Sequence, residues 1–285
     1  MMNKEEQIIH LIKNSLQEDI GDGDHSTLST IDAAASGKAV LKIKQEGFLA
    51  GMHVAEKIFR FMQPDIEFTA YKNDGDEMNF GETAFEVKGR VHTILQCERL
   101  VLNCMQRMSG IATLTHHYVQ KLEGFHTRLL DTRKTTPNFR VLEKEAVRIG
   151  GGMNHRIGLY DMIMLKDNHI DYCGGIQQAI KKANEYVRTQ QPHLKIEVET
   201  RSIEDVQLVM EVGNVHRIML DNFLPEQIVE ALTLINSKYE TEASGGINYE
   251  NLTSYAATGV DYISSGAIIH QARSIDLSLK AMIVK

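Results

Sequence analysis

The chain has 285 residues, of which 42% are hydrophobic and 24% are charged, and its formal net charge at pH 7 is −7. These values are ordinary for a globular protein of one or two domains. An acidic chain without a basic tail argues against a nucleic-acid-binding protein. No apolar run approaches the roughly 20 residues that a membrane helix needs, so we expect no membrane partner.

The start of the chain and its cysteines point to the cytoplasm. Residues 1–16 are charged and amphipathic, and they lack the continuous apolar stretch of a signal peptide, so they predict a first helix. The three cysteines form no CxxC pair and no even framework. Reduced, buried thiols in the cytosol are therefore the expectation.

Residues 1–110 show a mixed α/β pattern. After the first helix, alternating or helical spacing of apolar residues predicts four elements, at 37–50 (strand), 51–62 (helix), 65–76 (strand) and 82–90 (strand). Residues 91–122 contain no proline and one glycine and predict one long helix. If that helix has a break, Ser109-Gly110 is the expected place.

From residue 126 onward, short apolar strands alternate with helical segments. This order predicts a parallel sheet with crossover helices. About six strand-helix units fit, so we expect a barrel smaller or more open than the eightfold form. Each strand ends in a polar residue, at the end where barrel enzymes place their active sites. These residues are Asp131, Lys166, Glu199, Asp221, Ser244 and Ser265.

Residues 131–169 form a positive island in this acidic protein. They hold seven Lys or Arg against five acids, a local balance of +2. Such an island suggests a strongly anionic ligand. Arg133 and Lys134 follow the first barrel strand, Asn154-His155-Arg156 follows three glycines, and Lys166 ends the next strand. The alternative is a solvated loop that pairs with its own acids, but three cationic groups favour a site.

Three carboxylates end neighbouring strands of the predicted barrel. Glu197 and Glu199 lie two positions apart on one strand, and Asp221 ends the next. Carboxylates there can hold Mg²⁺ beside a diphosphate or stabilise positive charge on a substrate. The alternative is that they pair with Arg133 or Lys166.

Small residues follow the last two strands, in Ser244-Gly245-Gly246 and Ser265-Gly266-Ala267. Each tripeptide alone is a weak signal, but two on consecutive strands match the usual barrel phosphate site. The histidines form no zinc pattern, and His116-His117 is expected to be structural. No GxGxxG follows a strand, so no dinucleotide cofactor is expected.

These motifs closely resemble the quinolinate phosphoribosyltransferase family, and the resemblance runs nearly end to end. Long, specific blocks carry it: LQEDIGDGDHST, CERLVLNCMQRMSGIAT, DTRKTTP, GGGMNHRIGLYDMIMLKDNHI, IEVET, IMLDN, ASGGI and GVDYISSGA. The resemblance implies an N-terminal α/β sandwich domain at 1–112, an α/β barrel catalytic domain at 113–267, and a C-terminal segment at 268–285 that returns to the first domain. It also implies a homodimer, with a hexamer as the larger alternative.

The activity implied by the resemblance joins quinolinate to phosphoribosyl pyrophosphate. Nicotinate mononucleotide, pyrophosphate and carbon dioxide are formed, as a step of de novo NAD biosynthesis. Mg²⁺ is expected to accompany phosphoribosyl pyrophosphate, and no organic cofactor is needed. A cytoplasmic glycosyltransferase is therefore expected.

The resemblance also implies roles for individual residues. Lys134 is expected near both substrates, and Arg99 is expected to reach the site from the neighbouring subunit. Glu199 and Asp221 are expected to face the ribose and to hold the metal indirectly, through pyrophosphate. Four residues are expected around the carboxylates of quinolinate, namely Arg133, His155, Arg156 and Lys166. Six are expected at the 5′-phosphate, namely Ser244, Gly245, Gly246, Ser265, Gly266 and His270.

The sequence departs from the family pattern at three places. Asn138-Phe139 replaces the usual Gly-Leu after a proline, Ala243 stands where Ser is common, and Ser265 replaces a frequent Val. The first departure could change the geometry of its loop. None removes a charged residue of the expected site.

Three other functions remain open. A lysine at a barrel strand end can form a Schiff base with carbonyl substrates, as in aldolases. A non-catalytic protein that binds a pyridine nucleotide would share the cationic pocket. A transferase that uses nicotinate instead of quinolinate would need fewer cations.

Overall fold

The computed structural model describes residues 2–282, and the chain divides into two compact units. Unit 1 comprises Met1–His116, Thr135–Gly151 and Ile268–Lys285, and unit 2 comprises His117–Lys134 and Gly152–Ala267. The family resemblance divided the chain into 1–112, 113–267 and 268–285. The observed division differs at residues 135–151, which belong to unit 1 although the chain on both sides of them belongs to unit 2. Among the described residues, no helix has the length and apolar content to cross a membrane.

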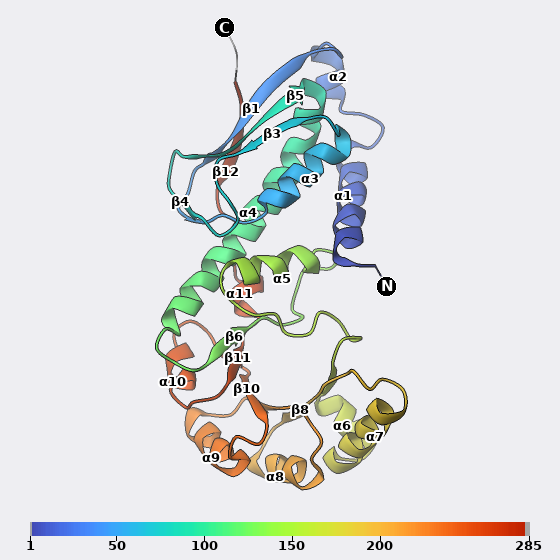
Figure 1. Ribbon diagram of the computed structural model, residues 1–285. Coiled ribbons are helices and arrows are strands. Elements are labelled where there is room, and N and C mark those ends of the chain that lie inside the picture. Colours follow the sequence, from blue (N-terminus) through green and yellow to red (C-terminus); the bar gives the residue numbers. More distant parts are fainter. Residues whose placement is uncertain (1, 283–285) are drawn as a thin grey trace. The chain divides into compact units, whose positions relative to one another are not determined.

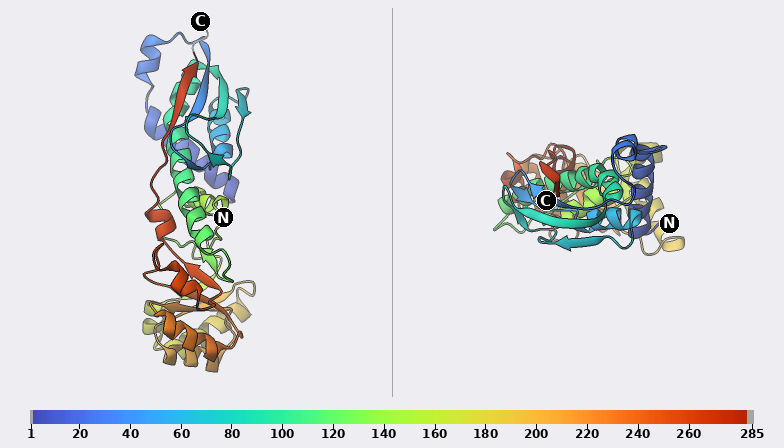
Figure 2. Two further views of the ribbon diagram at one scale, coloured as in Figure 1. Left: turned by 90° about the vertical axis from the view of Figure 1, so that its left-hand side faces the viewer. Right: turned by 90° about the horizontal axis from the view of Figure 1, so that it is seen from above.

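The main sheet of unit 1 has four strands in the order β12-β1-β5-β3, and every neighbouring pair is antiparallel. β12 comes from the C-terminal segment and lies beside β1, with Leu279 opposite Leu41 (Figures 1 and 2). A separate pair is formed by β2 and β4. The strands are β1 (Ser36–Ile43), β2 (Gly47–Phe48), β3 (Glu67–Ala70), β4 (Glu77–Met78), β5 (Thr83–Arg90) and β12 (Leu277–Met282).

Apolar side chains of the sheet and of several helices form the core of unit 1. Phe59 and Phe85 are fully buried, and their rings meet edge to face at 6.1 Å between centroids. The first helix begins where Asn3 and Glu6 form a reciprocal capping box. The helices of this unit, apart from the long one, are α1 (Lys4–Ile20), α2 (His25–Thr30), α3 (Met52–Met62) and α5 (Arg140–Ile149).

The long helix α4 runs without a break from Val91 to Lys121. The glycine at 110 does not interrupt it. A Cβ at Gly110 would lie 2.0 Å from the carbonyl oxygen of Arg273, so the glycine lets the C-terminal segment approach the helix. The close approach of the C-terminal segment, and not a kink in the helix, therefore explains why a glycine occupies position 110.

Unit 2 contains a six-stranded, fully parallel sheet in the order β6-β11-β10-β9-β8-β7. The consecutive strands β6 and β7 lie at opposite edges, so the barrel is open between them, as predicted. Met153 adds one parallel bridge to Leu130, on the free edge of β6. The strands are β6 (Arg128–Leu130), β7 (Ile163–Leu165), β8 (Ile196–Thr200), β9 (Arg217–Asp221), β10 (Glu240–Ser244) and β11 (Tyr262–Ser264).

Helices connect the parallel strands of unit 2 (Figure 1). The hydroxyl of Ser202 accepts a hydrogen bond from the amide of Asp205 and caps α8, and Pro225 occupies the first turn of α9, both as predicted. The helices are α6 (Asp167–Cys173), α7 (Ile176–Thr189), α8 (Ile203–Val212), α9 (Pro225–Ile235), α10 (Leu252–Ala256) and α11 (Ala267–His270), the last of which continues into unit 1.

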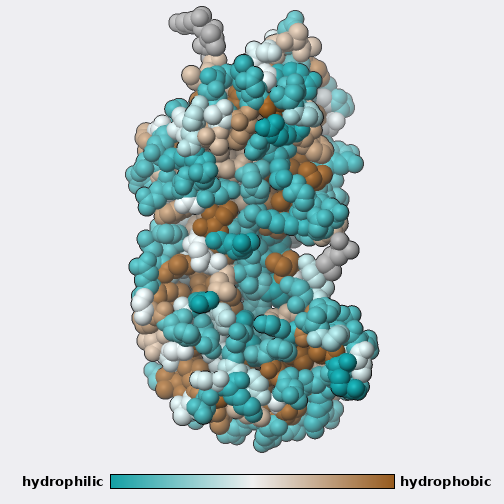
Figure 3. Space-filling view, in the orientation of Figure 1, coloured by the Kyte–Doolittle hydropathy of each residue, from teal (hydrophilic) through white to brown (hydrophobic). Residues whose placement is uncertain are grey.

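The surface agrees with the sequence composition. On the face shown in Figure 3, hydrophilic residues predominate and hydrophobic residues occur in small scattered groups. Scattered exposed apolar residues are normal for globular proteins.

Candidate active site at the strand ends of unit 2

Alternation along the parallel strands sends polar side chains to one face of the sheet. On β8 these are Glu197 and then Glu199, and on β9 they are Arg217 and then Asp221. The later residue of each pair lies at the carboxyl end of its strand. The face therefore has an outer polar layer at the strand ends and a deeper layer beneath it, as in barrel interiors.

The outer layer contains a lysine–carboxylate ion pair. Lys166 Nζ lies 2.9 Å from Glu199 Oε2. Burial, followed by the charge of Glu199, raises the pKa of the nearby Asp221, while Lys166 acts in the opposite direction. Lys166, Glu199 and Asp221 thus form one electrostatic group at neighbouring strand ends. The ion pair between Lys166 and Glu199 is the contact that the alternative interpretation of these carboxylates expected.

A second group brings two guanidinium ions close together. Burial lowers the pKa of Arg156, and the positive charge of Arg133 lowers it further. Arg156 is half-buried and donates to the main-chain carbonyl of Met162 at 3.2 Å. Two like charges held in one partly buried place favour an anion that bridges them.

The segment that carries Arg156 is anchored to the first barrel strand. Asp131 is fully buried, and its carboxylate accepts hydrogen bonds from the amide of His155 (2.8 Å) and from the side chain of Asn154 (2.6 Å). Asp131 itself directly follows β6. The triplet 154–156 is therefore fixed beside the strand end that also leads to Arg133.

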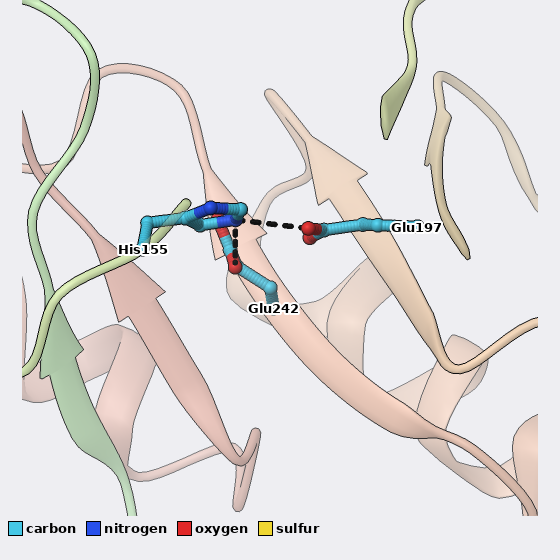
Figure 4. Close-up of side chains that lie close together, drawn as sticks. All are labelled: His155, Glu197 and Glu242. Atoms are coloured by element: carbon cyan, nitrogen blue, oxygen red, sulfur yellow. Dashed lines mark ion pairs between the residues drawn. The ribbon is translucent and has the colours of Figure 1, made fainter. Parts of the chain in front are cut away.

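His155, which the resemblance placed at the quinolinate carboxylates, is a buried residue. It is 7% exposed, and Nε2 lies 2.8 Å from Glu197 and 3.2 Å from Glu242 (Figure 4). Burial opposes the imidazolium, but the two carboxylates outweigh it and raise the pKa of His155 to about 9. The amide of Arg156 donates to Nδ1 at 2.6 Å and opposes a second proton. In both charge states the proton on Nε2 therefore faces the carboxylates.

The deep layer continues from Glu242 to an arginine. Arg217 Nη1 lies 3.0 Å from Glu242, and Nη2 lies 3.1 Å from Glu240 at the start of β10. Its guanidinium also stacks over the ring of Tyr262, 4.2 Å from the centroid. Sequence reasoning did not select Arg217 or Glu242. The available signal was the pair Glu240 and Glu242, two positions apart and in phase with Ser244.

The turn after β10 has the backbone that a phosphate site requires. Gly245 and Gly246 both have positive φ, +90° and +63°, and a Cβ at Gly246 would meet no atom within 4 Å. Accessible main-chain amides in such a turn suit an anion. The turn after β11 differs, because the amide and hydroxyl of Ser265 already donate to the carbonyls of Leu130 and Ile247. Of the two turns, 244–246 is the more open.

The remaining predicted residues lie in different places. Lys134 is exposed and follows Arg133 in unit 2, while His270 is exposed at the end of α11 in unit 1. Gly266 is buried directly after β11. Arg99 belongs to unit 1, where it lines a cavity of about 360 Å³ together with Glu18, Asp19 and Arg107 among others.

The loop that departs from the family pattern keeps a tight turn. Asn138 has φ +62°, the left-handed conformation that glycine favours and that asparagine tolerates best among other residues. The amide of Phe139 donates to the carbonyl of Thr136 at 3.1 Å. Asparagine therefore takes the backbone conformation that the usual glycine would allow.

Comparison with protein families gives two matches that together cover most of the chain. Residues 24–109 match the family described as the quinolinate phosphoribosyl transferase N-terminal domain. Residues 111–280 match the corresponding C-terminal domain. The junction at 109–111 falls within α4.

Similar proteins support the same grouping. The chain is 41% identical over 285 residues to quinolinate phosphoribosyltransferase [decarboxylating] 2b, mitochondrial, of Nicotiana tabacum, covering 95% of this chain and 81% of that one. It is 42% identical over 274 residues to the probable nicotinate-nucleotide pyrophosphorylase [carboxylating] of Bacillus subtilis, covering 96% and 93%. The crystal structure of NadC from Streptococcus pyogenes has a TM-score of 0.91 and 39% identity, with 98% of each chain covered.

Proposed function

The chain belongs to the quinolinate phosphoribosyltransferase family, and from this premise we propose that it transfers phosphoribosyl from phosphoribosyl pyrophosphate to quinolinate, with decarboxylation to nicotinate mononucleotide. This reaction would place it in de novo NAD biosynthesis, as a pentosyltransferase. The proposal rests on both the family and the site.

One observation carries the proposal: burial and the positive charge of Arg133 lower the pKa of Arg156, while Glu197, two positions before Glu199 on β8, acts on Arg156 in the opposite direction. Quinolinate has two carboxylates, which suit two guanidinium ions and an ammonium ion. At an effective dielectric near 20, a unit charge pair 4 Å apart is worth about 4 kcal/mol. Several such pairs offset the repulsion between two anionic substrates.

The first bond change is the transfer itself. The pyridine nitrogen of bound quinolinate attacks C1 of the ribose, the new C–N bond forms, and pyrophosphate leaves with the electrons of the C1–O bond. C1 becomes positively charged as this happens. Glu199 and Asp221, at adjacent strand ends, would stabilise that charge, and Lys134 would neutralise the leaving group. Holding both reactants in one place also removes an entropic cost.

Decarboxylation follows from the same bond. Once alkylated, the pyridine nitrogen is cationic and can accept electron density from the adjacent ring carbon. The C2–carboxylate bond then breaks, carbon dioxide leaves, and the ring carbon takes up a proton. No organic cofactor is needed for this step.

The residues at the strand ends fit a magnesium ion. Mg²⁺ prefers oxygen ligands and commonly binds one or two carboxylates together with substrate phosphates. Glu199 raises the pKa of Asp221, so a second positive charge beside Lys166 would relieve the repulsion between the two carboxylates. Glu199 and Asp221 would hold the ion indirectly, and when bound it would neutralise charge on pyrophosphate.

The phosphate of the ribose would bind at the glycine turns. The open turn at Ser244, Gly245 and Gly246 offers main-chain amides, and Gly266 and His270 are the further expected contacts. Because Ser265 already donates both of its hydrogens, we assign it a structural part in this site.

Two alternatives are less favoured by particular contacts. A Schiff-base lysine must be free to attack a carbonyl, but Lys166 is held in an ion pair with Glu199 at 2.9 Å. A transferase for nicotinate would need to hold one carboxylate, whereas Arg133 and Arg156 offer two guanidinium ions. A pure binding protein would not need the carboxylates of Glu199 and Asp221 beside the ribose.

Assembly and location belong to the same proposal. We propose a homodimer in which Arg99 reaches the partner's site, with a hexamer as the larger possible assembly. We propose the cytoplasm as its location, although the tobacco relative is named mitochondrial. Size-exclusion chromatography with light scattering would measure the assembly directly.

Incubation of the purified protein with quinolinate, phosphoribosyl pyrophosphate and Mg²⁺ tests the proposal. We expect nicotinate mononucleotide, pyrophosphate and carbon dioxide in equal amounts. Product formation from nicotinate but not quinolinate would reject the assignment of the substrate. Trapping of a keto substrate by borohydride at Lys166, with no nucleotide formed, would support the Schiff-base alternative instead.

A further inference from the structure

A path of charged side chains runs beneath the candidate site, from His155 through Glu197 and Glu242 to Arg217 (Figure 4 shows the first three). Glu197 and Glu242 have 0% exposure, and Arg217 has 8%. Burying two carboxylates is costly unless they are paired. The mechanism above uses neither carboxylate, so their presence requires another explanation.

We propose that Glu197 and Glu242 are positioning residues: they fix the ring of His155, and through it the segment that holds Arg156 at the quinolinate carboxylates. The inference rests on the proposed function, because it assigns these residues to the binding of that substrate. It adds two residues that do not themselves touch either substrate.

The contacts of the ring carry the first step. Nε2 of His155 faces the two carboxylates, and Nδ1 lies 2.6 Å from the amide nitrogen of Arg156, from which it accepts a hydrogen bond when the ring is neutral. The ring therefore connects the interior of the sheet directly to the main chain of Arg156. Rotation of the ring would break the contact at Nδ1 as well as those at Nε2.

The second step is that the segment is anchored at two points. Asp131 holds the amide of His155 and the side chain of Asn154, while Glu197 and Glu242 hold the ring. With the main chain fixed on both sides, the Arg156 guanidinium stays beside Arg133 despite their repulsion. Loss of the deeper anchor would let the two guanidinium ions separate.

The third step concerns charge. Glu197 forms its ion pair with His155, whose Nε2 lies 2.8 Å from Oε2. Glu242 has Arg217 as a second partner. Burial and the charge of Glu242 raise the pKa of Glu197, and His155 acts in the opposite direction. Loss of His155 would therefore favour the protonated form of Glu197 and leave it with no ring to hold, so removing Glu197 as well should cost little more.

A metal ion is the competing explanation, since the three side chains could also coordinate one. However, the guanidinium of Arg217 already lies 3.0 Å from Glu242 and would repel a cation bound there. The ring proton on Nε2 already supplies the donor that both carboxylates need. We therefore assign the group to positioning, and metal analysis of the purified protein forms part of the test.

The test compares Glu197→Ala and Glu242→Ala with the wild type in steady-state kinetics, with each substrate varied in turn. We expect kcat/KM for quinolinate to fall by about tenfold or more, with KM for phosphoribosyl pyrophosphate changed by less than about twofold, since supporting contacts of this kind typically contribute 10–100-fold. Glu197→Gln should lose less, because its amide oxygen can still accept the proton from Nε2. Equal losses for both substrates in all variants would overturn the proposal.

Glu240→Gln is the matched control. It removes a contact of Arg217 at the start of β10 without touching His155, so we expect near-normal kinetics for both substrates. If this control loses quinolinate binding as strongly as Glu197→Ala, general damage to the sheet explains the effect and positioning is rejected. Circular dichroism and thermal melting identify a variant that fails to fold, and Glu197→Gln then remains as the conservative test.

A double-mutant comparison separates positioning from simple additivity. If Glu197 acts through His155, then His155→Asn/Glu197→Ala should be no worse for quinolinate than His155→Asn alone. Losses that multiply would show that Glu197 acts without the ring and would overturn the inference. One equivalent of tightly bound metal, lost in Glu242→Ala, would also overturn it. If the wild type forms no nucleotide, the proposed function is rejected. If the wild type turns over normally, the variants test the positioning role alone.

Discussion

Lys166 Nζ lies 2.9 Å from Glu199 Oε2, so the ends of β7 and β8 are joined by an ion pair at the mouth of the parallel sheet. The two side chains differ in exposure, at 47% for Lys166 and 7% for Glu199. An ion pair with one exposed partner contributes little to stability. We therefore expect the ion pair to hold the ammonium group of Lys166 at the site, and not to stabilise the fold.

We expect Lys166→Ala to lower kcat/KM by on the order of 10²-fold or more, as is typical for loss of one contact to a transition state. Arg133→Ala should have an effect of similar size, because it removes one of the two guanidinium ions that we propose bind the substrate carboxylates. Initial rates of nicotinate mononucleotide formation would measure both.

Lys181→Ala is a suitable control for that experiment. Lys181 is exposed on α7 and lies away from the strand ends, so its loss should leave turnover unchanged. Near-normal turnover by both Lys166→Ala and Arg133→Ala would mean that the positive island does not bind the substrate.

Gly245→Ala should impair the use of phosphoribosyl pyrophosphate. A Cβ there would lie 2.2 Å from Oδ1 of Asn222 at a φ of +90°, so the turn and Asn222 must both move. Asn222 donates to Asp221 at 2.6 Å, and its displacement would also disturb that carboxylate. We expect about a tenfold or larger fall in kcat/KM for phosphoribosyl pyrophosphate, comparable to loss of a directional contact.

Gly259→Ala controls for backbone strain alone. Gly259 has a φ of +87°, but a Cβ there would meet no atom within 4 Å. Its substitution should lower the melting temperature without changing KM for either substrate. If both variants lose activity equally, strain rather than the phosphate site explains the result.

The sequence predicted the elements that carry the outer layer of the site. Strand ends could be located because short apolar runs stop at polar residues, and parallel strands bring those ends together. Lys166, Glu199 and Asp221 therefore formed a predictable group. The long helix was also predictable, because a run without proline and with helical spacing has few alternatives.

The deep layer was not predictable in the same way. Nothing in a single sequence shows that His155 lies 2.8 Å from Glu197, because their separation of 42 positions is closed by tertiary structure alone. The cationic island was recognised from local composition, and the family resemblance placed His155 among the expected quinolinate contacts, but neither indicates how deeply a side chain is buried. His155 is buried because β8 and β10 place Glu197 and Glu242 against its ring, and this arrangement depends on the tertiary structure.

The assignment of residues 135–151 to unit 1 has a similar cause. Arg107 on α4 lies 2.8 Å from the buried carboxylate of Glu143 on α5, and the other oxygen of Glu143 accepts the amide of Thr136. These contacts hold a helix of the middle of the chain within unit 1. The amphipathic pattern of α5 predicts a helix, but it does not specify which sheet the helix packs against.

Arg99 should act across the subunit interface if the proposed dimer forms. An Arg99→Ala protein and a Lys166→Ala protein, each inactive, should recover activity when their subunits are mixed and exchanged. One hybrid site would then have both defects and the other would have none, so the recovered activity should approach a quarter of the wild-type value by statistical mixing of identical interfaces. Mixed dimers that form but remain inactive would reject a shared site.

His53 should make stability depend on pH. Hydrogen bonds to Asp74, and then to Glu145, raise its pKa from 6.5 to about 9. Lys4 also pairs with Glu145, at 2.5 Å, so charged groups from α1 and α5 face this histidine. Because the folded-state pKa is higher than the unfolded one, the stabilisation is complete below about pH 6.5 and is lost as the pH rises through about 9.

Urea unfolding at several pH values would measure this effect. His53→Asn should unfold more easily than the wild type below about pH 6.5, and the difference should shrink toward pH 9, because the charged form is then lost. His155 also has a pKa raised to about 9, so the comparison with the variant, rather than the wild-type curve alone, isolates His53. His193→Asn, at an exposed position, should leave the curve unchanged. A difference between wild type and His53→Asn that stays constant from pH 6 to 9 would mean that the ion pairs of His53 do not stabilise the fold.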